Sequence, residues 1–192
     1  MSSLFLQDLR IIYLCEGGMI VRIDLDTVPE HERTAAASTG GISPSPGSGL
    51  YYPPGSPLRH LIAHHETASA CAGALVDQMD AYFGGELQDF TLDVKFPDGT
   101  QFEQDVWRTL RDVPYGAARS YRWLAERIGR PRASRAVGQA LGKNPLPIVL
   151  PCHRVIASDG SLGGYSCGVA IKELLLRLES EGPAHSLLRH LM

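Results

Sequence analysis

A cysteine lies beside a histidine in the segment Pro151–Val155 (Pro-Cys-His-Arg-Val), directly after the apolar run Pro147–Leu150. The proline fixes the approach of the backbone to Cys152. This is how a nucleophilic thiol would be presented. The alternative is a small buried cysteine without reactivity, which is what most free cysteines are.

A reactive thiol needs a nearby base, because a free cysteine has a pKa of about 8.5 and is mostly protonated at neutral pH. His153 is the nearest base, and a carboxylate that orients the imidazole would complete a Cys-His-acid relay. Spacing does not choose among the candidate acids, which are Glu179, Glu173 and Asp159. A metal site is disfavoured, because an adjacent Cys and His with no second pair make a poor chelate. A cysteine protease is the main enzymatic rival.

Two short helices with a tight turn between them are predicted just before this segment. Ser120 is a good N-cap for a helix over 121–128, and Gly129-Arg130-Pro131 ends that helix. A second helix over about 132–141 is rich in Ala, Ser and Gly, so it can approach another surface closely, with Arg135 projecting from it. This is the helix-turn-helix pattern.

Positive charge collects over the same stretch. Residues 119–154 carry eight Lys and Arg against a single acid, Glu126, although the whole chain has a net charge of −3. The first 99 residues are acidic, with 5 Lys and Arg against 13 Asp and Glu. The local excess suggests a polyanion partner, most simply nucleic acid, but a solvated basic face explains the charge equally well. The charge and the helix-turn-helix pattern together favour nucleic acid. A protease would explain neither this charge nor the helix pair.

The remaining elements follow from hydrophobic periodicity. Period-two patterns predict strands over 9–14, 19–25 and 90–96, and 3.6-residue patterns predict helices over 66–83, 101–112 and 168–180. Residues 27–66 have loop composition, so we expect an irregular excursion there. The domains expected are an N-terminal α/β domain over 1–98, a DNA-binding and catalytic domain over 99–182 and a loose tail over 183–192.

Composition argues for a cytoplasmic protein. No apolar run reaches the roughly 18 residues that a membrane span needs, and no secretory signal is recognisable. The widely spaced cysteines, Cys15, Cys71, Cys152 and Cys167, form no CxxC pair, which favours a reducing compartment over a disulfide scaffold.

The segment Pro-Cys-His-Arg-Val-Ile resembles the active-site signature of the O6-alkylguanine-DNA alkyltransferases. The resemblance covers roughly residues 72–181, with matched blocks in the family's order: Val-Pro-Tyr-Gly (113–116), Ser-Arg-Ala-Val-Gly (134–138), Asn-Pro (144–145), Gly-Tyr-Ser (164–166) and Leu-Glu (178–179). The chain departs from the pattern at Cys167, where the family usually has glycine, and at Ser134, where alanine is common.

The resemblance implies an α+β fold. An N-terminal α/β domain with a short antiparallel, RNase H-like sheet would precede a mostly helical, winged helix-turn-helix-like domain that carries the active site. It implies DNA repair by irreversible transfer of an alkyl group from O6-alkylguanine, and from O4-alkylthymine, to the protein's own cysteine after base flipping through the minor groove. No cofactor is implied, and the partner is double-stranded DNA, bound by a monomer with cooperativity left open. The alternative is a module that binds alkylated DNA without transfer.

The resemblance also assigns roles to residues. Cys152 would accept the alkyl group, His153 would act as its base through water, and Glu179 would orient the imidazole. Asn144 would brace the cysteine turn and Tyr121 would contact the phosphate and the base. The DNA-binding residues would be Arg135, Tyr121, Ser134, Gly138 and Arg122, and the base pocket would be lined by Leu141, Pro147, Val155, Tyr165 and Ser166, with Lys172 behind Tyr121.

Overall fold

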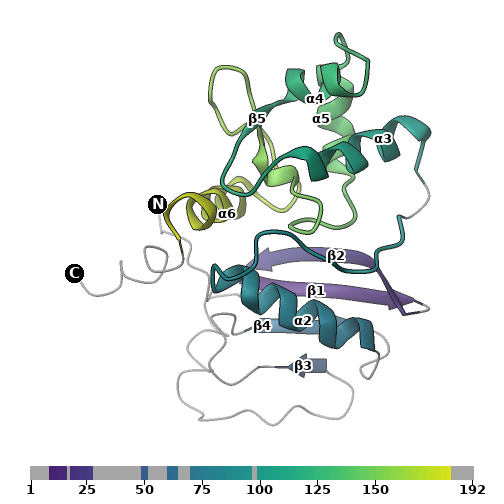
Figure 1. Ribbon diagram of the computed structural model, residues 1–192, viewed down its shortest axis with the longest axis vertical. Coiled ribbons are helices and arrows are strands. Elements are labelled where there is room, and N and C mark those ends of the chain that lie inside the picture. The colour runs from purple at the N-terminus through teal and green to yellow at the C-terminus, as the bar shows by residue number, and fades with distance from the viewer. Residues whose placement is uncertain are drawn as a thin grey trace. The chain divides into compact units, whose positions relative to one another are not determined.

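The computed structural model describes residues 9–16, 18–27, 49–51, 60–64, 70–96 and 99–182 (Figure 1). These residues belong to two compact units, which divide between Lys95 and Phe96. The predicted tail over 183–192 lies outside the described residues. None of the described helices is long and apolar enough to cross a membrane.

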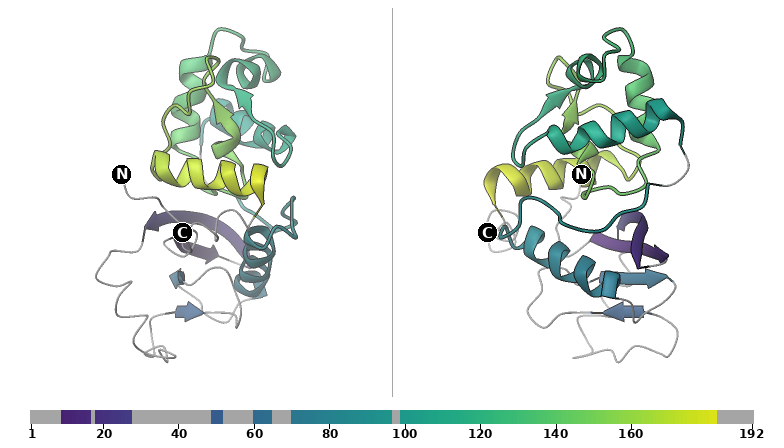
Figure 2. Two further views of the ribbon diagram at one scale, coloured as in Figure 1. Left: turned by 90° about the vertical axis from the view of Figure 1, so that its left-hand side faces the viewer. Right: turned by 45° about the vertical axis from the view of Figure 1, so that its right-hand side comes forward.

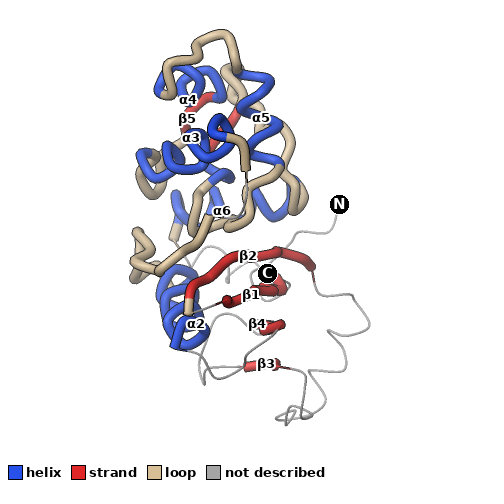
Figure 3. Tube along the Cα trace, turned by 90° about the vertical axis from the view of Figure 1, so that its right-hand side faces the viewer, coloured by secondary structure: helices blue, strands red, loops and turns tan. Residues whose placement is uncertain are grey.

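The first unit is built on a four-stranded sheet in the order β2-β1-β4-β3 (Figure 3). The predicted strands appear as β1 (Leu9–Glu16) and β2 (Met19–Thr27), an antiparallel pair. The alternation of apolar and polar residues in these strands follows from strand geometry, because every second side chain points to the same face of a sheet. On β1 this buries Leu9, Ile11 and Tyr13.

The prediction of an irregular excursion over 27–66 is wrong in part. Two short strands lie within it, β3 (Gly49–Tyr51) and β4 (His60–His64). β1 and β2 pair antiparallel, as do β3 and β4, but β4 pairs with β1 in parallel, so the sheet is mixed and the predicted antiparallel sheet is wrong for this pair. These strands are too short for a period of two to stand out, and their positions depend on pairing, of β4 with β1 and of β3 with β4.

Helix α2 (Ala70–Phe83) lies against one face of this sheet (Figures 1 and 2). It buries Leu75, Met79 and Phe83 and ends where Gly85 adopts a φ of 77°. The strand predicted over 90–96 is wrong. Only Val94 forms a bridge, to Ile20 of β2, so a single residue of the sheet holds this segment.

The second unit begins with α3 (Gln101–Thr109), which continues as a 3₁₀ turn over Leu110–Asp112. Thr100 and Glu103 form a capping box, which satisfies the first free amides of the helix. Trp107 is buried, and its indole Nε1 donates to the carbonyl of Ala140 at 2.9 Å. This bond fixes α3 against the helix that carries Ala140.

The helix-turn-helix prediction matches α4 (Tyr121–Arg127) and α5 (Ser134–Gly142). Ser120 caps α4 as predicted, because its hydroxyl accepts from the amide of Trp123 at 3.0 Å. Residues 132–133 precede α5 rather than belong to it. Two short parallel strands, β5 (Arg119–Ser120) and β6 (Val155–Ile156), tie the start of α4 to the residues that follow Cys152.

Helix α6 (Val169–Glu181) closes the second unit. It starts after Gly168, whose φ of 100° few other residues adopt. Its buried side includes Ile171, Leu174, Leu175 and Leu178. Burial of each such side chain stabilises the fold by about 1.5–3 kcal/mol. This packing also brings Glu179, near the end of the helix, to the cysteine segment.

Candidate active site

Asn144 holds the turn that leads to Cys152. Its amide Nδ2 donates to the carbonyl of Leu150 at 2.8 Å, and its Oδ1 accepts from the backbone amide of Leu146 at 3.1 Å. Within the turn that these two hydrogen bonds close, Ile148 is buried with a φ of 74°, a conformation that costs about 1–3 kcal/mol for a β-branched residue. The asparagine therefore keeps a strained turn closed directly before the thiol.

The same amide reaches the thiol itself. Nδ2 of Asn144 lies 2.9 Å from Sγ of Cys152, which is 3% exposed. Burial raises the pKa of Cys152 to about 11, although hydrogen bonds from Asn144 and Tyr165 and the charge of Lys172 act in the opposite direction. Donors to sulfur stabilise the thiolate more than the thiol. The free protein thus holds a protonated thiol among groups arranged to stabilise its anion.

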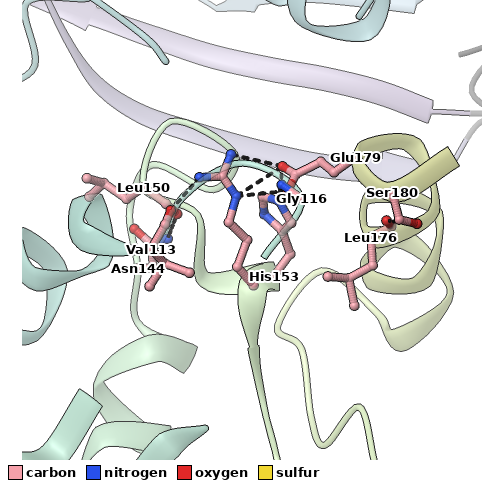
Figure 4. Close-up of polar contacts among 9 residues, drawn as sticks. Val113, Gly116, Asn144, Leu150, His153, Leu176, Glu179 and Ser180 are labelled. Atoms are coloured by element: carbon pink, nitrogen blue, oxygen red, sulfur yellow. Dashed lines mark hydrogen bonds and ion pairs between the residues drawn. The ribbon is translucent and has the colours of Figure 1, made fainter. Parts of the chain in front are cut away.

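His153 is fully buried and bound to Glu179 of α6 (Figure 4). Its Nε2 lies 2.8 Å from Oε1 of the carboxylate. An ionised carboxylate only accepts hydrogen bonds, so Nε2 carries the hydrogen and Nδ1 keeps a lone pair. No hydrogen bond from a described residue reaches Nδ1. Burial lowers the pKa of His153, so the ring is neutral at pH 7 and can take up a proton.

Arg154 is the third member of this cluster. Its guanidinium donates to both oxygens of Glu179 at 2.9–3.1 Å and to the carbonyl of Val113 at 2.7 Å. The amide of Gly116 donates to the same carboxylate at 3.0 Å. Burial alone would raise the pKa of Glu179, but the bonds from His153 and Arg154 outweigh it and bring the pKa to about 2. The carboxylate is therefore ionised and held rigidly against the imidazole.

A cavity of about 540 Å³ opens onto the thiol. Its lining comes from the start of α4, one face of α5, the cysteine turn and the 163–166 loop: Tyr121, Arg135, Gly138, Gln139, Leu141, Gly142, Cys152, Gly164, Tyr165 and Ser166. A volume of this size accommodates a small organic molecule. The cavity thus connects the exposed face of α5 to a buried sulfur.

Three of the predicted pocket residues do not line this cavity. Pro147 and Val155 are buried beside the cysteine turn, and Lys172 is fully buried behind Tyr121, with its Nζ 5.9 Å from the centre of the ring. The ammonium donates to the carbonyls of Val155, at 2.6 Å, and Leu162. The lysine thereby joins β6 to the loop that leads into one wall of the cavity.

Tyr121 lies on the cavity wall against a glycine. A Cβ added at Gly163 would meet the Tyr121 hydroxyl oxygen at 2.8 Å, and Gly163 itself has a φ of 67°. Gly138 also packs beside the ring, since a Cβ there would lie 3.7 Å from Cε1. Burial raises the pKa of Tyr121, so the phenol keeps its proton at neutral pH. Glycines thus leave room for a phenol that faces the cavity.

Apart from Arg154, which is bound to Glu179, the basic residues of the 119–154 stretch fall into two groups. Three are engaged by acids: Arg122 by Glu126 and Arg127 by Asp112, each at 3.0 Å, and Lys143 by Glu103 at 2.5 Å. Among the residues that the structure describes, no carboxylate pairs with the exposed side chains of Arg119, Arg130, Arg132 or Arg135. These four are the basic side chains most available to phosphate, whereas the predicted contact Arg122 is already paired. Ser134, also predicted to contact DNA, opens α5 half-buried.

Sequence reasoning missed two residues of the site. The partnership of Arg154 with Glu179 is invisible in a sequence, because the two residues are 25 positions apart and meet only through the packing of α6. Gln139 lines the cavity, and helical spacing from Arg135 would have found it, since residues four apart share a helix face. Cys167, one of the two departures from the family pattern, is half-buried beside Ser166 of the cavity wall.

A family model described as 6-O-methylguanine DNA methyltransferase, DNA binding domain, matches residues 101–181. A methylated-DNA–protein-cysteine methyltransferase of Methanosarcina barkeri is 53% identical over 102 residues, which are 53% of this chain and 64% of the relative, so the chain spans less than two thirds of that protein. The corresponding protein of Mycolicibacterium paratuberculosis is 51% identical over 59% of this chain and 68% of the relative.

A solved structure is similar over nearly the whole chain. Mycobacterium tuberculosis OGT in complex with DNA is 33% identical, covers 93% of this chain and 96% of that chain, and superposes with a TM-score of 0.66. The region that the family model matches, residues 101–181, contains the cysteine turn, the helix-turn-helix and α6. The family expected from the Pro-Cys-His-Arg segment is thereby confirmed, and the chain belongs to the methylated-DNA–protein-cysteine methyltransferases.

Proposed function

We propose that the protein repairs DNA by moving an alkyl group from O6-alkylguanine, or O4-alkylthymine, to Sγ of Cys152. The observation that carries this proposal is the single cavity lined both by the Cys152 thiol and by Arg135 of the helix-turn-helix. One end of it offers an acceptor sulfur, and the other lies on the helix that the positive charge marks as facing DNA. No cofactor takes part.

The chemistry is an in-line displacement. The thiol proton leaves to Nδ1 of His153 through a water, and the thiolate sulfur forms a bond to the alkyl carbon while the bond from that carbon to O6 breaks. The electron pair passes into the guanine, which takes up a proton, and Tyr121 is placed to donate it. Glu179 stabilises the imidazolium that results. The thioether is not reversed, so each molecule reacts once.

The base must leave the duplex to reach the sulfur. In this proposal α5 lies in the minor groove and Arg135 fills the space that the base vacates. This placement accounts for an exposed arginine at the mouth of a base-sized cavity. Extrusion costs a few kcal/mol, and less for a poorly paired lesion. The small residues of α5 support this docking, because they let its backbone approach the groove.

We also infer a winged helix-turn-helix for the second unit and an RNase H-like fold for the first. The pair α4–α5 with the small β5–β6 sheet supports the former, and the mixed sheet covered by α2 supports the latter. The protein acts as a monomer on double-stranded DNA in the cytoplasm, a location supported by cysteines that are widely spaced in the sequence and form no CxxC motif.

Mass spectrometry of the protein after incubation with an O6-methylguanine duplex tests the proposal. The expected result is one added methyl group on Cys152, absent in Cys152→Ala. Binding of the duplex by an unmodified wild-type protein would instead make it a module that recognises alkylated DNA without repairing it.

Arg135→Ala tests the flipping step. Single-turnover transfer from the duplex should fall far more than transfer from free O6-benzylguanine, because the free base needs no extrusion. Equal losses on both substrates would show that Arg135 acts in the chemistry rather than in flipping.

A further inference from the structure

One face of α5 forms a wall of the cavity. Arg135, Gly138, Gln139 and Gly142 line it, at positions i, i+3, i+4 and i+7, which lie on one side of a helix. Two of these four residues are glycines. Arg135 and Gln139 are therefore the side chains that project from this face.

Gln139 is exposed, and no described residue forms a hydrogen bond with its side chain. Its neighbour Ala140, in contrast, is buried and accepts the bond from Trp107, which fixes the helix at this position. The carboxamide thus stands on a rigid backbone with a donor and an acceptor both free to bind a ligand. Such a group reads a nucleobase edge that offers the complementary pair.

The distance from Arg135 limits what Gln139 can reach. Four residues of α-helix advance about 6 Å, and neighbouring base pairs are about 3.4 Å apart. If α5 runs along the groove and Arg135 occupies the space of the extruded base, the backbone of Gln139 lies within about two base-pair steps of that space, and its side chain can reach the adjacent pair. We propose that Gln139 reads the minor-groove edge of the base pair adjacent to the lesion and favours a pair that carries the guanine N2 amino group. This rests on the proposed function and adds a sequence preference to it.

The preference follows from the groove chemistry. In the minor groove every base pair offers acceptors, but only guanine adds a donor, its N2 amino group. The carboxamide nitrogen of Gln139 finds an acceptor beside any pair. Its oxygen finds a donor only where that amino group is present, and an unmatched oxygen loses a hydrogen bond. A good bidentate pair of this kind discriminates by about 1–3 kcal/mol, or about fivefold to more than a hundredfold in rate.

The experiment measures single-turnover methyl transfer from duplexes that differ only in the pair beside O6-methylguanine, on either side. Guanine·cytosine is compared with inosine·cytosine, which lacks the amino group, and adenine·thymine with 2,6-diaminopurine·thymine, which gains it. We expect the amino-bearing pair to react at least about fivefold faster in both comparisons, on one side of the lesion. Pairs with the amino group are the more stable, so an effect of duplex stability on flipping would have the opposite sign.

Gln139→Ala should bring both ratios close to one. Arg132→Ala is the matched control, because loss of a phosphate contact should slow all four duplexes alike and keep the ratios. Equal rates in the wild type, or ratios that persist in Gln139→Ala, overturn this inference while transfer itself stands. Absence of transfer from every duplex would overturn the proposed function and this inference together.

Discussion

Nδ2 of Asn144 lies 2.9 Å from Sγ of Cys152 while the same side chain closes the turn around Ile148. One amide thus shapes the backbone that carries the nucleophile and stabilises the nucleophile's anion. Experiments can separate the two roles. Stabilisation of the thiolate changes how the reactivity of Cys152 depends on pH, whereas shaping of the turn does not.

Asn144→Ala should slow alkyl transfer by about tenfold to a hundredfold, since a hydrogen bond to a charged group contributes about 1.5–3 kcal/mol. The rate of thiol alkylation by iodoacetamide against pH measures the cause, and its midpoint should move up from the wild-type value. Asn144→Asp keeps the acceptor for Leu146 but adds a negative charge, so its midpoint should move further up. An unmoved midpoint in both variants would mean that Asn144 is only a structural brace.

Acid should destabilise the protein through the buried His153–Glu179 pair. The pKa of Glu179 is lowered to about 2 in the fold, so its contribution is present above its unfolded pKa of about 4.3 and is lost as pH falls toward 2. The pKa of His153 is also lowered in the fold, so below about pH 6.5 the unfolded protein binds a proton that the folded protein does not. This also lowers stability as the pH falls. Urea unfolding at a series of pH values should show stability falling from pH 7 toward pH 3.

Glu179→Gln supplies the comparison for this acid effect. Arg154 would then be a buried charge without its carboxylate, and loss of one partner of such a pair costs about 3–5 kcal/mol. The stability of the variant at pH 7 should be low and should fall less steeply between pH 5 and pH 3. A wild-type slope retained in the variant would assign the acid effect to other carboxylates.

Gly163→Ala should disturb Tyr121. The new Cβ would lie 2.8 Å from the phenol oxygen at a φ of 67°, so strain of about 1–3 kcal/mol adds to a clash. Both the thermal midpoint and the transfer rate should fall. Gly160→Ala is the matched control, because Gly160 has a φ of 85° but nothing within 4 Å, so only its thermal midpoint should fall. Equal effects of both changes on transfer would contradict the role of Tyr121.

The salt dependence of DNA binding should distinguish free from paired arginines. Each phosphate contact contributes about −0.9 to the slope of log K against log salt concentration. Arg132→Ala should make that slope shallower by about 1, whereas Arg127→Ala should change it less because Asp112 already binds Arg127. Fluorescence anisotropy with an undamaged duplex at several salt concentrations gives both slopes. Identical changes would mean that the Asp112 pair opens on DNA.

Local signals predicted the elements that local sequence controls. Ser120 capped α4 as expected, because a cap depends on residues three apart, and α3 and α6 followed the spacing of their apolar residues. β4 was missed because a five-residue strand that begins and ends with histidine carries little pattern, and its position depends on pairing with β1, which lies far away in sequence. Residues 90–96 alternate as a strand does, yet only Val94 finds a partner.

The sequence likewise predicted only the part of the site that local residues determine. The Pro-Cys-His-Arg motif is continuous, so the thiol, its candidate base and the family were visible in the sequence. Spacing alone left three candidate acids, and it is the packing of α6 that brings Glu179 to His153. The positions of Val155 and Lys172 behind the cavity wall depend on contacts across the unit, which no local pattern encodes.

The burial that raises the pKa of Cys152 to about 11 also determines how long an unused molecule stays competent. Under the proposed function each molecule reacts once, so it loses that function to any small electrophile that meets an ionised sulfur. With the thiol protonated and buried, we expect background alkylation to be slow and the lifetime of the acceptor in the absence of damage to be extended. The proposed reaction would then start only when a base enters the cavity, which makes the lesion itself the trigger.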